Sequence, residues 1–208
     1  MNLRLLPVFL LLGLVYSGCS PVPRRIEETP AYTLAYDLRL KHLRLLDHWA
    51  LDGRLAISDG KEGGSGSFSW AQDDRMTRIS FRGTLGKGAW QLRSDASGAR
   101  LELASGEVHY APSIAELVRK QVGWKVPVNA LSWWIKGLAD PKDWETRTLD
   151  EEGRLRSLRQ FGWEVDFANY GEPDNFWLPA KLVARRGDYS VKMVVRNWRL
   201  GRGVTALD

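Results

Sequence analysis

The sequence is poor in the residues that build disulfides and metal sites. Its 208 residues include one cysteine, Cys19, and three histidines, His42, His48 and His109. A single thiol cannot form an intramolecular disulfide or a thiolate metal site, and no two histidines have the H-x-x-x-H spacing of a zinc helix. The sequence therefore predicts no metal and no cofactor, and a fold that is stabilised by its apolar core alone.

Recognisable catalytic motifs are also missing. The chain has no G-x-S-x-G nucleophile elbow. Its glycine-rich stretches, Gly64-Ser65-Gly66 and Gly86-Lys87-Gly88, complete neither a P-loop nor a dinucleotide-binding pattern. The carboxylate pairs Asp73-Asp74 and Glu151-Glu152 fall in predicted turns, where hydration is their expected role. We therefore predict that the protein is not an enzyme.

Charge of one sign is not concentrated anywhere along the chain. The formal net charge is +5, and the 30 Lys and Arg residues are interspersed with 25 Asp and Glu residues. Such a mixture is typical of a solvated surface and not of a nucleic-acid-binding stripe. We expect no nucleic-acid partner, and a mild attraction to anionic lipid headgroups.

One long apolar run is present, at the start of the chain. Arg4 precedes apolar residues 5–16, and Ser17-Gly18-Cys19-Ser20 follows them. A basic start, a short apolar core and small residues before a cut are typical of a secretory signal peptide, and the run is too short for a transmembrane helix. We predict a signal peptide over residues 1–18 and a mature chain that begins at Cys19.

The position of Cys19 resembles the bacterial lipobox, although Tyr16 stands where leucine is usual. That pattern implies that the Cys19 thiol takes a diacylglycerol and that the freed amine is acylated. Two or more acyl chains hold a protein firmly on a membrane. Ser20, in place of the aspartate that retains such proteins at the inner membrane, implies the periplasmic face of the outer membrane. An ordinary secreted protein with a chance cysteine is the alternative.

Residues 19–30 are predicted to be the lipidated N-terminus and a flexible tether. Pro21, Pro23 and Pro30 alternate with charged residues there, so the segment has nothing to bury. At full extension it reaches at most about 36–40 Å. The rest, residues 31–208, is predicted to form a single domain.

Hydrophobic periodicity in this domain changes from helical to strand spacing. Leu34, Leu38 and Leu45 follow a helical period, which predicts a helix over Tyr32–His48. Short runs between Gly, Asp or Ser turns then predict an antiparallel sheet that curls. The predicted strands are Leu51–Ile57, Ser65–Trp70, Thr77–Phe81, Ala89–Leu92, Leu101–Leu103, Arg154–Gln160, Trp163–Phe167, Ala180–Ala184 and Val191–Asn197.

Two short helices are predicted between the two groups of strands. Ser113 and Glu116 form a capping-box pattern that opens a helix running to about Val122. A second helix covers Val128–Gly137, after Pro127 and with its last glycine as the C-cap.

Tryptophan is unusually abundant, with ten residues. A buried indole N–H needs a partner, so tryptophan is rarely used merely to fill a core. On the inside of a curled sheet, tryptophans on strands would line an apolar cavity of the kind that binds ligands. An ordinary filled core is the alternative.

A lone leucine, Leu85, stands among small and polar residues in the probable strand connection Arg82–Gly88. It either folds back under its own turn or is held out on an arm that can dip into a bilayer.

An ordered set of short motifs resembles the LolB family, outer-membrane lipoproteins that receive other lipoproteins from a soluble periplasmic carrier. The motifs are Trp49-Ala50-Leu51-Asp52-Gly53-Arg54-Leu55-Ala56, Phe68-Ser69-Trp70, Leu85-Gly86, Val126-Pro127-Val128 with Leu131, Trp134-Ile135-Lys136-Gly137, Trp163-Glu164-Val165-Asp166-Phe167 with Tyr170, Leu178-Pro179 and Asn197-Trp198. The resemblance implies a mainly β fold with short helices: an unclosed antiparallel β-barrel that covers a hydrophobic cavity plugged by α-helices.

The resemblance also implies the site and the function. Trp70, Trp134, Trp163 and Trp198 are expected to line an acyl-chain cavity, and Leu85 is expected to be the leucine of the membrane-insertion loop. The protein would take acylated lipoprotein cargo from a LolA-like carrier and insert it into outer-membrane phospholipid, acting as a monomer. A lipocalin-like binder of free lipids and a structural envelope lipoprotein are the alternatives.

Overall fold

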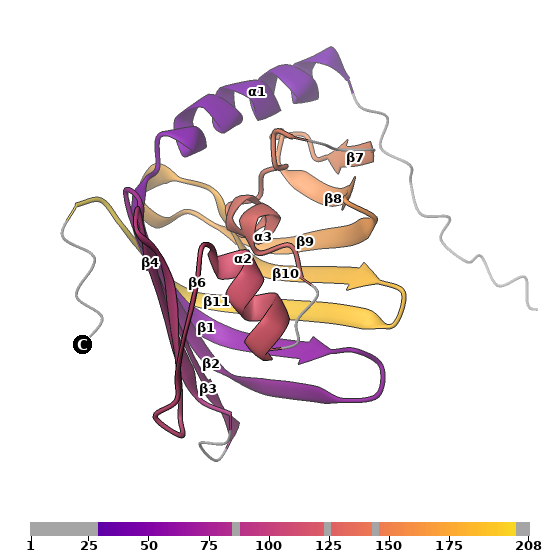
Figure 1. Ribbon diagram of the computed structural model, residues 1–208. Helices are drawn as coiled ribbons and strands as arrows, with labels where there is room; N and C mark the ends of the chain where they lie inside the picture. The colour runs from indigo at the N-terminus through magenta and orange to yellow at the C-terminus, as the bar shows by residue number, and fades with distance from the viewer. Residues whose placement is uncertain (1–28, 85–87, 123–125, 143–145, 203–208) are drawn as a thin grey trace, which may run out of the picture.

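One open antiparallel sheet dominates the structure (Figure 1). The computed structural model describes residues 29–84, 88–122, 126–142 and 146–202. The predicted signal peptide, Cys19 and Leu85 lie outside the described residues. The sheet has 11 strands in the order β6-β5-β4-β3-β2-β1-β11-β10-β9-β8-β7, so β6 and β7 are its two edges. This arrangement confirms the predicted unclosed barrel.

The sheet consists of two meanders that meet at one seam. The first contains β1 (His48–Ser58), β2 (Gly63–Asp73), β3 (Met76–Gly83), β4 (Trp90–Asp95), β5 (Gly98–Leu103) and β6 (Val108–Ala111). The second contains β7 (Thr146–Leu149), β8 (Leu155–Gln160), β9 (Trp163–Gly171), β10 (Leu178–Arg186) and β11 (Tyr189–Leu200), with a short 3-10 helix, η3, at Pro173–Asn175. Pairing of β1 with β11 joins the two meanders into one wall.

The predicted strands are confirmed, most of them with slightly wider bounds, although β4 and β8 each begin one residue later than predicted. In β11, for example, Val191, Met193 and Val195 are buried while Lys192 and Arg196 on the other face are exposed. This alternation follows from the period of two along a strand. The two short edge strands, β6 and β7, are not among the strand ranges predicted from the sequence.

Helix α1 (Pro30–Arg44) lies across one end of the sheet (Figure 1). Thr29 caps it by accepting a hydrogen bond from the Tyr32 amide, and Pro30 occupies the first turn, where its missing N–H costs nothing. The helix ends four residues before the predicted end at His48, because His48 already pairs with Asp73 as the first residue of β1.

Two further helical segments lie inside the concave face of the sheet (Figure 1). The first is α2 (Ile114–Leu117), which continues as a π-helix, η2 (Val118–Val122). The second is α3 (Val128–Trp134). Leu117, Val118, Leu131 and Trp134 are buried against the sheet. We call α2, η2 and α3 together the helical plug.

The helix caps that the sequence predicts at Ser113 and Gly137 are present in the structure. The Ser113 hydroxyl accepts a hydrogen bond from the Glu116 amide, as expected for the N-cap, and the Glu116 carboxylate pairs with Lys120. After α3, the amides of Gly137 and Leu138 donate to the carbonyls of Trp134 and Trp133. Gly137 has a φ of +71°, so this is a Schellman cap in which glycine is the favoured residue.

Candidate functional site

An apolar cavity lies between the sheet and the helical plug. It is lined only by carbon-rich side chains: Leu55, Ile57, Phe68, Trp70, Ile79, Trp90, Val118, Val126, Val128, Leu131, Val191 and Met193. Its volume is about 40 Å³, whereas pockets that hold a small ligand measure about 300–1,000 Å³. In this structure the plug therefore fills most of the hollow.

Two grooves border this cavity at the η2 end of the plug. The larger, which we call the mouth groove, has a volume of about 740 Å³ and shares Ile57 and Trp90 with the cavity. Gly83, Thr84 and Gly88, which flank residues 85–87, also line it. The smaller, of about 300 Å³, is lined by Val122, Val126 and Trp163 among others. Displacing η2 would join both grooves to the cavity.

The four tryptophans expected at the site have different positions. Trp70 lines the cavity and Trp163 lines the smaller groove. Trp134 is fully buried in the plug, where its Nε1 donates to Gln160 Oε1 at 2.8 Å and its ring lies 6.4 Å from that of Trp163. Trp198 packs on Trp49 with ring centroids 5.6 Å apart, away from the cavity lining. The structure thus brings one of the four to the cavity and one to a groove that borders it.

Two tryptophans that were not singled out take part in the site. Trp90 lines both the cavity and the mouth groove, and its ring stacks on Phe81 at 5.8 Å. Trp49 lies 5.6 Å from Trp70 as well as from Trp198, so it links the cavity wall to the β1–β11 seam. Trp90 and Leu92 are two residues apart in β4 and both are buried, with exposed Gln91 between them. This period of two is the sequence pattern that could have indicated an inward-facing Trp90. Trp124 and Trp144 lie outside the described residues.

Several tryptophan side chains at or near the cavity have a buried indole N–H group that makes no described hydrogen bond. The Nε1 atoms of Trp70, Trp163 and Trp198 have no hydrogen-bond partner among the described residues. Buried polar groups are nearly always paired, and an unpaired donor destabilises the state that contains it.

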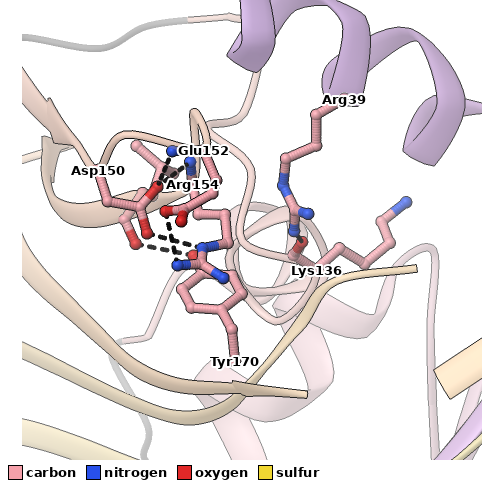
Figure 2. A network of polar contacts seen from close by, with 7 residues as sticks. Arg39, Lys136, Asp150, Glu152, Arg154 and Tyr170 are labelled. Carbon is pink, nitrogen blue, oxygen red and sulfur yellow. Dashed lines mark hydrogen bonds and ion pairs between the residues drawn. The ribbon is translucent and has the colours of Figure 1, made fainter. Parts of the chain in front are cut away.

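A polar network fixes the opposite end of the plug (Figure 2). Arg39 of α1 donates to the Lys136 carbonyl at 3.2 Å, and Lys136 Nζ donates back to the Leu43 carbonyl at 3.3 Å. Arg39 and Arg154 both lie over the Tyr170 ring, at 5.4 and 5.3 Å. Burial lowers the pKa of Arg39 and raises the pKa of Tyr170. These contacts hold α1, the end of α3 and the sheet together.

Arg154 anchors this network through two carboxylates (Figure 2). It pairs with Asp150 at 2.7 Å and with Glu152 at 2.9 Å. Glu152 is thus an ion-pair partner as well as a hydrated turn residue. Asp73 likewise contacts His48 Nδ1 at 2.6 Å, so these two carboxylates have side-chain partners in addition to the expected hydration.

Lys136 makes stability depend on pH. Burial lowers its pKa from 10.5 to about 8, so the unfolded state binds more protons between those values and stability rises with pH there. A shift of this size corresponds to roughly 3 kcal/mol. We expect urea denaturation to show a rise of about 2 kcal/mol from pH 7.5 to 9.5. Above pH 10 the raised pKa of Tyr170 acts in the opposite direction, because the unfolded phenol ionises first.

The Lys136→Met variant is the control for this prediction. Methionine retains apolar contact with Trp133, which lies 5.0 Å below the ammonium group, and the Leu43 carbonyl still accepts from the Leu46 amide. The rise should be absent from this variant. An equal rise in both proteins would assign the effect to other groups.

In the part of the chain that the structure describes, no three His, Cys, Asp or Glu residues are arranged to hold a metal ion. No helix within the described ranges is long and apolar enough to cross a membrane. The described site consists of an apolar cavity, tryptophan side chains and the helical plug that covers them. Together, fold and site define the class of open β-barrels whose internal helices cover a hydrophobic cavity.

Comparisons with known proteins identify the family within this class. The family described as "Outer membrane lipoprotein LolB" matches residues 47–198. The chain is 34% identical to the outer-membrane lipoprotein LolB of Pseudomonas fluorescens (strain Pf0-1), covering 96% of this chain and 97% of that one. It is 33% identical to the LolB of Pseudomonas aeruginosa (strain LESB58), covering 97% and 100%. The chain belongs to the LolB family and is an outer-membrane lipoprotein, not an enzyme.

Solved structures agree on the fold. A LolA superfamily protein from Nitrosomonas europaea superposes with a TM-score of 0.55 at 5% identity, covering 80% of this chain and 93% of that one. A putative outer membrane lipoprotein-sorting protein domain from Vibrio parahaemolyticus superposes with a TM-score of 0.52 at 10% identity, covering 82% and 92%. At these identities the likeness concerns the fold alone.

Proposed function

We propose that the protein accepts acylated lipoproteins from a LolA-like carrier, shelters their acyl chains under the helical plug and releases them into outer-membrane phospholipid. Membership of the LolB family supports the role in lipoprotein reception and insertion. The observation that supports the mechanism is the wholly apolar cavity between strand-borne tryptophans and a separate helical cover.

Loading requires the plug to move. A cavity of about 40 Å³ is far smaller than a small-ligand pocket of about 300–1,000 Å³, and an acyl chain contains many methylenes. The end of α3 is held by Arg39 and by the Trp134–Gln160 hydrogen bond. The η2 end borders both grooves instead. We therefore place chain uptake at η2, with the α3 end as the fixed side.

Transfer along this route needs no chemical energy source. Burying one methylene contributes about 0.8 kcal/mol, and a tenfold preference of acceptor over donor requires about 1.4 kcal/mol. Two extra buried methylenes therefore suffice to draw cargo from the carrier. The buried Nε1 donors of Trp70 and Trp163 supply a second source of preference, because the carbonyl of an acyl chain can accept from them.

Two residues outside the described ranges, Cys19 and Leu85, have roles in anchoring the protein and in releasing the cargo. Acylation of Cys19 would fix the acceptor at the membrane where cargo is released. Leu85, between residues that line the mouth groove, would engage the bilayer at release. A monomer is sufficient, because one chain provides cavity, cover and anchor.

Clamping the plug to the sheet tests this mechanism. Gln121 on η2 and Gly64 on β2 both line the mouth groove. Gln121 is exposed, and a Cβ at Gly64 would have no described atom within 4 Å. With the Cys19 thiol acylated, the Gly64→Cys/Gln121→Cys protein carries two free thiols. A disulfide-containing bismaleimide that spans them should lower acceptance of lipoprotein from the carrier at least tenfold, and reduction of the linker should restore it.

The two single-cysteine variants, each labelled with the same reagent, are the controls, and both should accept cargo at the wild-type rate. Full acceptance by the clamped protein would show that the plug does not cover the binding site. Acceptance of free fatty acid but not of acylated protein by the unclamped wild type would favour the lipocalin-like alternative.

A further inference from the structure

Helix α1 exposes a row of leucines. Leu34, Leu38 and Leu45 are 61%, 50% and 79% exposed. At 100° per residue their directions fall within about 40° of one another. Lys41 points in the same direction, whereas the Arg44 guanidinium lies over the Trp133 ring of the plug, 5.9 Å from its centre. We call Leu34, Leu38, Lys41 and Leu45 the outer face of α1.

This face cannot turn inward, because the opposite side of the helix is fixed. Tyr36 and Leu43 are buried, and the Tyr36 hydroxyl accepts a hydrogen bond from the Ala139 amide at 3.1 Å. The Arg147 guanidinium lies 4.3 Å from the centre of the Tyr36 ring. Gly153 approaches so closely that a Cβ there would be 2.5 Å from the Tyr36 amide nitrogen. The exposed leucines are thus a permanent feature of the surface.

The position of α1 in the chain indicates what covers this face. The helix begins at Pro30, so the segment from Cys19 spans at most about 36–40 Å. A helix with apolar and basic residues on one side binds at the interface of a membrane, and anionic lipid strengthens the contact. Within the outer face, Lys41 supplies one positive charge, and the exposed acids Asp37 and Asp47 lie nearby.

We propose that the outer face of α1 lies in the surface of the anionic-lipid-containing membrane to which the protein is anchored. The inference rests on the proposed acylation of Cys19. It adds a second, non-covalent contact, which sets the orientation of the body.

The orientation has a consequence for cargo transfer. Helix α1 and the end of β3 that borders the mouth groove lie at opposite ends of the molecule (Figure 1). With α1 on the membrane, the mouth groove faces away from the lipid, toward a carrier arriving from the periplasm. Release near Leu85 then requires the body to leave this contact and turn on its tether.

A fluorescent probe placed on the outer face tests the contact. Because acylation consumes the Cys19 thiol, Leu38→Cys would carry the only free thiol of the lipidated protein, and an NBD group can be attached there. In vesicles of phosphatidylethanolamine and phosphatidylglycerol containing a spin-labelled lipid, we expect at least twofold quenching at position 38. The control is Ser105→Cys, an exposed position on the mouth groove, where quenching should be absent.

The outcomes at the two positions separate the alternatives. Quenching at 105 and not at 38 would reverse the orientation, and an absence of quenching at both would leave the tether as the only contact. Either result would overturn the inference. Acceptance of cargo from the carrier, measured on the same labelled proteins, distinguishes this failure from a failure of the proposed function.

A second measurement uses the unlipidated mature chain, Cys19→Ser, which has no covalent anchor. Replacing Leu34, Leu38 and Leu45 with serine should lower its partition into the same vesicles at least tenfold, without changing its circular dichroism spectrum. Equal partition of both chains would overturn the inference. So would a dimer of the Cys19→Ser chain that the leucine substitutions abolish, because a second copy would then cover the face.

Discussion

The Gly53→Ala variant is expected to be less stable than the wild type by about 3–5 kcal/mol, because the seam of the sheet cannot accommodate a methyl group there. A Cβ at Gly53 would lie 2.0 Å from the Val194 carbonyl oxygen of β11. Relieving that overlap requires β1 and β11 to separate, which breaks ladder hydrogen bonds and opens the core. Urea denaturation of the unlipidated chain measures the loss.

The seam is sensitive because the pairing of β1 with β11 joins the two meanders of the sheet. The register between β1 and β11 shifts at Asp52 and Gly53, as at a β-bulge. The Asp52 carboxylate binds Asn197 Nδ2 at 2.9 Å and Arg199 Nη1 at 3.0 Å across the seam. Bulge and polar contacts together fix how the two meanders meet.

Gly64→Ala is the matched control, since it makes the same change in the adjacent strand. A Cβ at Gly64 would have no described atom within 4 Å, so we expect a change within about 0.5 kcal/mol. Backbone entropy alone would stabilise both variants, so similar losses at positions 53 and 64 would mean that the close approach at the seam is not the reason for the loss at Gly53.

Elements with strong periodicity could be predicted from the sequence. Strand β11 was recognisable because Val191, Met193 and Val195 alternate with exposed residues, and α3 because Pro127 and Gly137 mark its ends. Strand β7 was missed because its four residues bury only Leu149. An edge strand that short has no period to detect, and its pairing with β8 determines its structure.

The candidate site was less predictable than the fold. The abundance of tryptophan indicated that indoles matter, but which of them reach the hollow depends on strand register. Phe81 pairs with Trp90 across β3 and β4, and this pairing carries Trp90 to the cavity wall. The network around Lys136 was invisible for a similar reason, because Arg39 and Lys136 are 97 residues apart. Closure of the cavity by the plug is a result of packing, which a linear pattern does not record.

The Leu85→Glu variant is expected to accept lipoprotein normally and to lose at least tenfold in the rate of its release into membranes. Burial of a leucine contributes about 1.5–3 kcal/mol, and a charged side chain at the centre of a bilayer costs about 2.5–3.5 kcal/mol. Partial insertion makes each contribution smaller, but both oppose release. Acceptance should be unchanged, because the substitution leaves every side chain of the described cavity lining in place.

Release can be measured by loading the anchored protein with radiolabelled lipoprotein and following its transfer to outer-membrane vesicles. Leu85→Met is the matched control, since an apolar residue of similar volume should retain release within about twofold of the wild type. A glutamate variant that releases cargo as fast as the methionine variant would show that the β3–β4 connection does not act on the bilayer. Loss of acceptance as well as release would instead place Leu85 on the uptake route, beside Thr84 and Gly88 at the mouth groove.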